Sequence, residues 1–196
     1  GNTQGSGMGG MASLDKLYLC YREDRQAPGD ILQETLINVM AGWLVQDYVG
    51  SFGPSVHPVG ACATAAVSLA TAWDLIQVGK ADFVVAGGFD DLSVEGNLGF
   101  SSMQATAATD DMLARGIGPR AMSRPNDIRR DGFVESHGGA TLLLTTVEKA
   151  VEMGLPIYGC LALAESHNDG LQTSIPAPGK GLLALGARTR GRRAPL

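Results

Sequence analysis

The chain has few charges and no long apolar runs. Charged residues make up 18% of its 196 residues, and 20 acidic side chains outnumber 15 basic ones, for a formal net charge of −5. This balance argues against nucleic acid as a partner, because no basic face stands out before the arginines at the end of the chain. No apolar run approaches the roughly 18 residues that a membrane-spanning helix needs. The N-terminal GNTQGSGMGG also lacks both the basic and the apolar segment of a signal peptide, so we expect no membrane partner.

Cysteine is scarce too. The three cysteines, Cys20, Cys62 and Cys160, are odd in number and widely spaced, which fits neither a disulfide framework nor a zinc site. Free thiols are typical of a reducing compartment, so we expect a cytoplasmic protein. Nothing in the sequence indicates a bound metal ion or a resident cofactor.

Hydrophobic residues, at 44%, are plentiful enough for one globular domain or part of a larger one. Their periodicity predicts strands that alternate with helices, which is typical of an α/β layered fold. Helices are predicted over 11–21, 31–49, 62–78 and 147–153, and strands over 55–59, 82–88, 138–146 and 157–164. The apolar runs at 82–88 and 138–146 predict buried strands.

The stretch 55–80 organises the rest of the chain. SVHPVG is predicted as a short strand with a tight turn at Gly60, and ACATAAVSLATAWDLIQVGK as a long helix with Cys62 in its first turn. At a helix N-terminus, the unpaired N–H groups and the helix dipole favour a thiolate and can stabilise an oxyanion. Cys62 is therefore a candidate nucleophile, and the competing interpretation is a small buried core cysteine.

The glycines of Gly5-x-Gly7-x-x-Gly10 match the dinucleotide-binding fingerprint. That fingerprint needs a strand before its first glycine, and only four residues precede Gly5. We favour a loop at which backbones pack closely. Because such a loop in a parallel-sheet domain normally follows a strand, we also expect a chain that is truncated at its N-terminus.

Two acidic stretches raise further alternatives. Asp90, Asp91 and Glu95 follow the strand predicted at 82–88 and could form a metal site or a carboxylate pair. Adjacent side chains usually diverge, so we favour solvated or capping carboxylates. The loop 123–133 mixes both signs of charge, which predicts local ion pairs rather than an anion site.

Four blocks of the sequence agree in order and spacing with one family. VHPVGACATA, GKADFVVAGGFDD, SRPNDIRRDGFVES and SIPAPGKG together resemble the β-ketoacyl synthase domain of type I fatty acid synthases, those of actinobacteria first and the fungal α-chain next. The resemblance covers residues 1–185 and implies the N-terminal half of a thiolase-like layered αβαβα fold. It implies that Cys62 is the acyl-accepting nucleophile, that Phe100 borders the acyl channel and that Leu36 lines the acyl pocket.

The resemblance also implies a reaction and its partners. Cys62 would accept an acyl group from the phosphopantetheine arm of an acyl carrier domain. Malonyl on that carrier would lose CO2 and attack the new thioester, in a decarboxylative Claisen condensation. The arm is a substrate carrier and not a bound cofactor, and the parent protein would be a homo-oligomer, because the family is dimeric.

The end of the chain departs from the family. Members use two histidines that follow the SIPAPG block, whereas His57, His137 and His167 precede it, so none of these three is assigned to catalysis. Residues 186–196 form an arginine-rich tail, which we interpret as truncation or a frameshift, and we expect the fragment alone to be unable to condense. Two alternatives stay open, a non-catalytic ketosynthase-like dimer partner and a nucleotide-binding oxidoreductase fragment built on residues 5–10.

Overall fold

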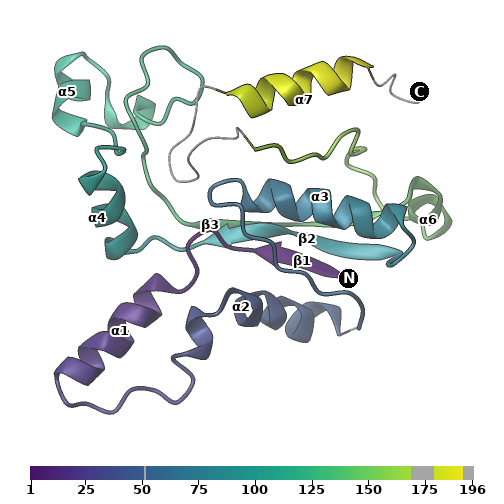
Figure 1. Cartoon of the computed structure of the whole chain (residues 1–196), viewed down its shortest axis with the longest axis horizontal. Helices are drawn as coiled ribbons and strands as arrows, with labels where there is room; N and C mark the ends of the chain where they lie inside the picture. The colour runs from purple at the N-terminus through teal and green to yellow at the C-terminus, as the bar shows by residue number, and fades with distance from the viewer. Residues whose placement is uncertain (51, 169–178, 192–196) are drawn as a thin grey trace.

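A mixed sheet of three strands forms the centre of the described chain (Figure 1). The structure is a computed structural model that describes residues 1–50, 52–168 and 179–191. The strand order is β1 (Asn2–Gly5), β2 (Phe83–Asp90), β3 (Gly138–Thr145), with β2 parallel to β1 and antiparallel to β3. The carboxyl ends of β1 and β2 therefore meet the amino end of β3 at one end of the sheet.

Helices cover both faces of this sheet. α3 (Thr64–Gln77) lies along one face, and α2 (Ile37–Leu44) packs beside β1 on the other (Figure 1). The core forms where Ala72 and Leu75 of α3 meet Val84 and Ala86 of β2. The buried residues of α3 recur every three or four positions, as a helix packed on a sheet requires. The layers are thus helix, sheet and helix, and the predicted α/β class is confirmed.

The remaining elements lie around this centre. They are α1 (Met11–Arg22), η1 (Gln33–Thr35), η2 (Val45–Val49), α4 (Val94–Ser102), α5 (Thr109–Ala114), η3 (Pro119–Ala121), α6 (Val147–Glu152) and α7 (Lys180–Gly191). Among the residues that the structure describes, no helix combines the length and apolarity needed to cross a bilayer.

The elements that depend on local periodicity are confirmed. α1, α3, α6, β2 and β3 each begin and end within about two residues of the predicted bounds, which is the usual uncertainty of element ends. The burial of β2 is confirmed as well, since Val84 and Ala86 are fully buried. The predicted burial of β3 is wrong, because most of this edge strand is exposed.

Two predictions about strands near Cys62 are wrong. A strand does precede the glycine-rich loop, because all of β1 pairs with β2. Segment 55–59 forms no strand, and only Ser55 makes a single bridge, to Asn2. Pro58 has no N–H to donate, so it cannot continue a ladder on that side of β1.

The helix predicted over 31–49 is interrupted at Leu36. The backbone there is extended, with φ −89° and ψ 120°, between the 3-10 turn η1 and α2. The cause is tertiary. Gly10 packs so closely on the backbone of Glu34 that a Cβ would collide with it, and Ser13 Oγ donates to Glu34 Oε2 at 2.9 Å. Such contacts override helical periodicity.

The C-terminal part also differs from the prediction. Segment 157–164 is irregular rather than a strand, and Tyr158 within it is 96% exposed. Of the SIPAPGKG block, residues 174–178 lie outside the described residues. Residues 186–191 of the predicted arginine-rich tail continue α7.

Candidate active site around Cys62

Cys62 lies in a sharp turn that leads into α3. The helix begins at Thr64, two residues later than predicted, and its N-cap residue is Ala63. No side chain caps this end of the helix, because the side chain of alanine has no oxygen that could accept a hydrogen bond from it. The thiol of Cys62 is exposed, which does not fit the alternative of a buried core cysteine.

The turn is strained and is held by a hydroxyl. Ala61, directly before Cys62, has φ +49°, a left-handed conformation that costs a non-glycine residue roughly 1–2 kcal/mol. The buried Thr64 Oγ1 donates to the carbonyl of Ala61 at 2.7 Å and accepts from the N–H of Gly60 at 2.9 Å. Thr64 therefore closes the turn around Cys62 with both of its hydrogen bonds.

Replacing Thr64 with valine should destabilise the chain by about 1–3 kcal/mol, because it keeps the shape and removes both hydrogen bonds of a buried hydroxyl. The free energy of unfolding from urea titration measures this. Thr64→Ser is the control, since serine keeps the hydroxyl. Equal stability of the valine and serine variants would contradict the role given to the hydroxyl.

The glycine-rich loop packs directly on this turn. A Cβ at Gly7 would lie 2.6 Å from the carbonyl oxygen of Ala61, and one at Gly5 would lie 2.6 Å from Thr64 Cγ2. Side chains at these positions would have to displace the turn. The favoured interpretation, a loop at which backbones pack closely, is confirmed.

The loop also surrounds a carboxylate from the end of β2. Asp90 Oδ1 accepts hydrogen bonds from Ser6 Oγ at 2.7 Å, Gly7 N–H at 3.0 Å and Met8 N–H at 3.1 Å. Ser6 Oγ in turn accepts from Gly9 N–H at 2.8 Å. Asp90 thus caps the loop, as the favoured interpretation of the acidic stretch predicted. The N–H groups that would hold a phosphate bind this carboxylate instead, which speaks against a dinucleotide site.

A pocket of about 280 Å³ opens beside Cys62 at the end of the sheet. It lies where the carboxyl ends of β1 and β2 meet the amino ends of α3 and β3, and the carboxyl ends of strands are a common place for ligand sites in α/β sheets. Its lining consists of Gly5, Cys62, Thr64, Ala65, Gly88, Phe89, Asp90, Ser136, His137 and Gly138. No group of three or more metal-binding side chains forms within the described ranges.

The three histidines have different surroundings. His57 Nδ1 lies 2.9 Å from the carbonyl oxygen of Gln4, to which it can only donate, and His57 Nε2 lies 2.9 Å from Ser55 Oγ. Both nitrogens thus serve the structure. His167 Nε2 lies 3.1 Å from Glu165 Oε2. His137 lines the Cys62 pocket, a position that sequence analysis missed.

The mixed charges of loop 123–133 pair locally, as predicted. Asp127 forms ion pairs with Arg129 at 3.1 Å and with Arg124 at 3.2 Å, and Asp131 forms one with Arg115 at 3.4 Å. The hydrogen-bonded guanidinium of Arg129 is the main cause that holds the pKa of Asp127 well below its usual range. The acidic side chains of this loop thus take up much of its positive charge.

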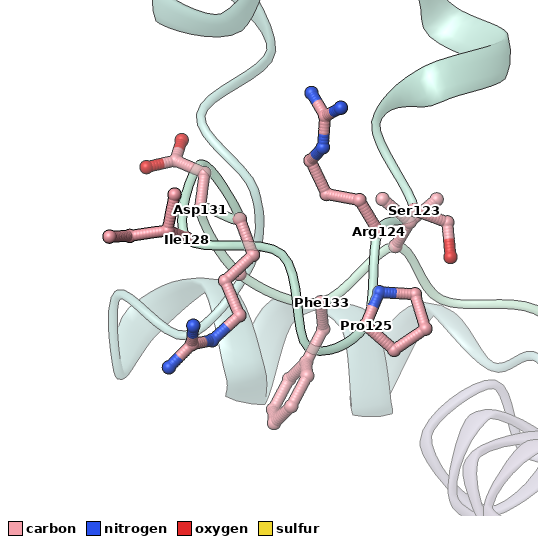
Figure 2. A pocket seen from close by; sticks show the side chains of 9 residues that line it. Ser123, Arg124, Pro125, Ile128, Asp131 and Phe133 are labelled. Carbon is pink, nitrogen blue, oxygen red and sulfur yellow. The ribbon is translucent and has the colours of Figure 1, made fainter.

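The same loop lines a second, larger pocket of about 770 Å³ (Figure 2). The Arg124 side chain extends to one side of the loop and the Phe133 ring to the opposite side (Figure 2). Phe133 meets Phe100 of α4 edge to face, with ring centroids 5.3 Å apart. Such pairs contribute about 0.5–1.5 kcal/mol beyond the area they bury.

The structure does not gather the predicted site residues in one place. Cys62 lines the smaller pocket, whereas neither Phe100 nor Leu36 lines either of these two pockets. Phe100 is half-buried against Phe133, and Leu36 is 45% exposed at the break before α2. Their predicted contact with an acyl chain stays a prediction.

Comparisons with known proteins agree with this architecture. Residues 1–150 match the family described as "Beta-ketoacyl synthase, N-terminal domain". The chain is 42% identical to the fatty acid synthase subunit alpha of Schizosaccharomyces pombe, over 100% of this chain and 11% of that protein. It is also 42% identical to a fatty acid synthase alpha subunit of Emericella nidulans, over 100% of this chain and 13% of that protein. The chain thus spans about a tenth of the length of these curated relatives.

A solved structure supports the fold. The crystal structure of a β-ketoacyl synthase from Burkholderia phymatum superimposes with a TM-score of 0.68 at 25% identity, over 80% of this chain and 37% of that one. The predicted thiolase-like α/β class is therefore confirmed. Together with the match over residues 1–150, this shows that the chain belongs to the β-ketoacyl synthase family.

Proposed function

We propose that residues 1–185 are a partial ketosynthase domain of a fatty acid synthase and that Cys62 is its acyl-accepting nucleophile. The observation that carries this proposal is the place of the exposed Cys62 thiol, in a strained turn before an uncapped helix N-terminus and on the wall of a pocket. Nucleophiles on such turns are open to attack a substrate, and nearby backbone N–H groups can stabilise an oxyanion.

The first step is transfer of an acyl group. The Cys62 thiolate attacks the carbonyl carbon of an acyl thioester on the phosphopantetheine arm of an acyl carrier domain. The tetrahedral intermediate bears the negative charge on its oxygen, and its collapse breaks the bond to the carrier sulfur, which leaves as a thiolate. The positive end of the α3 dipole and the backbone N–H groups at the start of this helix can stabilise the oxyanion.

The second step, which we assign to the parent protein and not to this fragment alone, lengthens the acyl group by two carbons. Malonyl on the carrier loses CO2, and the electron pair of the broken bond forms an enolate. Its carbon attacks the acyl-Cys62 thioester, the Cys62 thiolate leaves, and a β-ketoacyl group two carbons longer remains on the carrier. The proposed partners are thus an acyl carrier domain and, in a cytoplasmic parent protein, a second copy of the same domain.

The acylation step can be tested on the chain itself. The purified protein is incubated with an acetyl or octanoyl thioester of N-acetylcysteamine, and the modified cysteine is located by peptide mass mapping. We expect acylation at Cys62 and at least about tenfold less at Cys160, which is also exposed but lies in an irregular segment. Equal acylation of both cysteines, or none at Cys62, would refute the proposal.

The same experiment tests Leu36 and Phe100, which we propose contact the acyl chain. Leu36→Gln and Phe100→Gln should lower octanoyl transfer by about threefold or more and leave acetyl transfer unchanged, because each buried methylene contributes about 0.8 kcal/mol. Leu32→Gln is the control, since this leucine is 60% exposed. A variant that slows acetyl and octanoyl transfer equally would contradict the proposed contact of that residue with the acyl chain.

A further inference from the structure

We propose that Asp90 is a positioning residue for Cys62. Its carboxylate organises the glycine-rich loop, and the loop in turn fixes the strained turn that presents the thiol. The inference rests on the proposed function where it concerns acyl transfer. The presentation of Cys62 itself can be measured without an acyl donor.

The first link joins Asp90 to the loop. Asp90 is the last residue of the central strand, where its backbone pairs with Gly138 of β3. One of its oxygens accepts hydrogen bonds from the Ser6 hydroxyl and from the N–H groups of Gly7 and Met8, at 2.7 to 3.1 Å. Charged acceptors form the stronger hydrogen bonds of this kind. The carboxylate thus binds three successive residues of the loop to β2, the strand that pairs with a neighbour on each side.

The second link joins the loop to the turn. Gly7 lies so close to Ala61 that a Cβ would stand 2.6 Å from its carbonyl oxygen and 3.0 Å from its carbonyl carbon. The same carbonyl oxygen accepts a hydrogen bond from the hydroxyl of Thr64. Ala61 therefore has little room to leave its left-handed conformation while the loop stays in place. Any movement of Ala61 would move Cys62, which follows it directly.

Asp90 also belongs to the site by position. It lines the same pocket as Cys62, yet its Oδ1 faces the loop, where it holds three donors. Its neighbour Asp91 is exposed. The two acids are adjacent and carry the same charge, so Asp91 is a matched control for any long-range effect of charge on Cys62.

The experiment measures how fast iodoacetamide alkylates each cysteine, with peptide mapping to separate the sites. Cys160 is exposed and serves as the reference, whereas Cys20 is 3% exposed and reports unfolding. In the wild type we expect Cys62 to react about two- to fivefold faster than Cys160, the advantage that a helix N-terminus gives an anion. In Asp90→Ala the ratio of the Cys62 rate to the Cys160 rate should fall to about one, while Cys20 stays protected from alkylation. Asp90→Asn keeps an acceptor oxygen and should restore at least about half of the advantage, and Asp91→Ala should match the wild type.

An Asp90→Ala protein with protected Cys20 and an unchanged ratio would overturn the proposal. If Asp90→Ala exposes Cys20 to iodoacetamide, the same alkylation rates are measured on Ser6→Ala, which removes only one of the three donors to Asp90. The result for Ser6→Ala then decides between the two roles. A lowered ratio with protected Cys20 supports positioning, and any other result shows that the contact serves only the stability of the fold. Acyl transfer is then measured on the same variants. Loss of the alkylation advantage in a protein whose wild type accepts no acyl group would support the positioning role and refute the proposed function.

Discussion

Replacing Cys62 with alanine should abolish acyl transfer to position 62 and leave only the slow acylation of Cys160, and Cys62→Ser should slow transfer to position 62 at least about a hundredfold. A thiol is already partly thiolate near neutral pH, whereas a serine hydroxyl needs a base to remove its proton. Acyl-adduct formation with the N-acetylcysteamine thioesters measures the rate, and peptide mass mapping separates acylation at position 62 from acylation of Cys160.

The fold of these variants should be unaffected, because the Cys62 side chain is exposed and the turn is held by Thr64 and the glycine-rich loop. Cys160→Ala is the matched control and should acylate at the wild-type rate. Residual acylation of Cys62→Ala at more than about a tenth of the wild-type rate would mean that another group is the acceptor, and the assignment of Cys62 would be wrong.

The features that could be predicted from the sequence are those that neighbouring residues determine. The alanine-rich stretch after Cys62 has helix propensity and a buried stripe at helical spacing, so α3 forms within about two residues of its predicted bounds. Close packing at residues 5–10 followed from glycines at which larger side chains would collide with backbone. In each case the decisive information lies within one short segment.

The features that could not be predicted depend on pairing between distant segments. β3 runs antiparallel to β2, and the register that pairs Asp90 with Gly138 brings His137 and Ser136 to the Cys62 pocket. A prediction of alternating strands and helices does not specify this direction, and a parallel strand would carry its residues to the other end. The same holds for the partners of Asp90, because its capping role could be predicted but the loop residues that it binds lie more than 80 residues away in sequence.

A methyl group at position 7 should disrupt the site more than most substitutions of the chain. Gly7→Ala places a Cβ 2.6 Å from the carbonyl oxygen of Ala61, and both partners are backbone that cannot rotate away. Either the loop or the turn must shift, so we expect a loss of about 1–3 kcal/mol in the free energy of unfolding. Cys62 should also lose its alkylation advantage over Cys160.

Gly42→Ala provides the matched control for this prediction. Gly42 lies inside α2 with nothing within 4 Å of an added Cβ, so the same methyl group should stabilise the helix by up to about 1 kcal/mol. A loss of stability in Gly7→Ala together with a gain in Gly42→Ala would show that the close approach of Gly7 to Ala61 determines the geometry of the Cys62 turn. The loss of a glycine as such would then not be the cause. If Gly7→Ala is as stable as the wild type and Cys62 reacts unchanged, the loop does not hold the turn, and Thr64 alone must account for the left-handed conformation of Ala61.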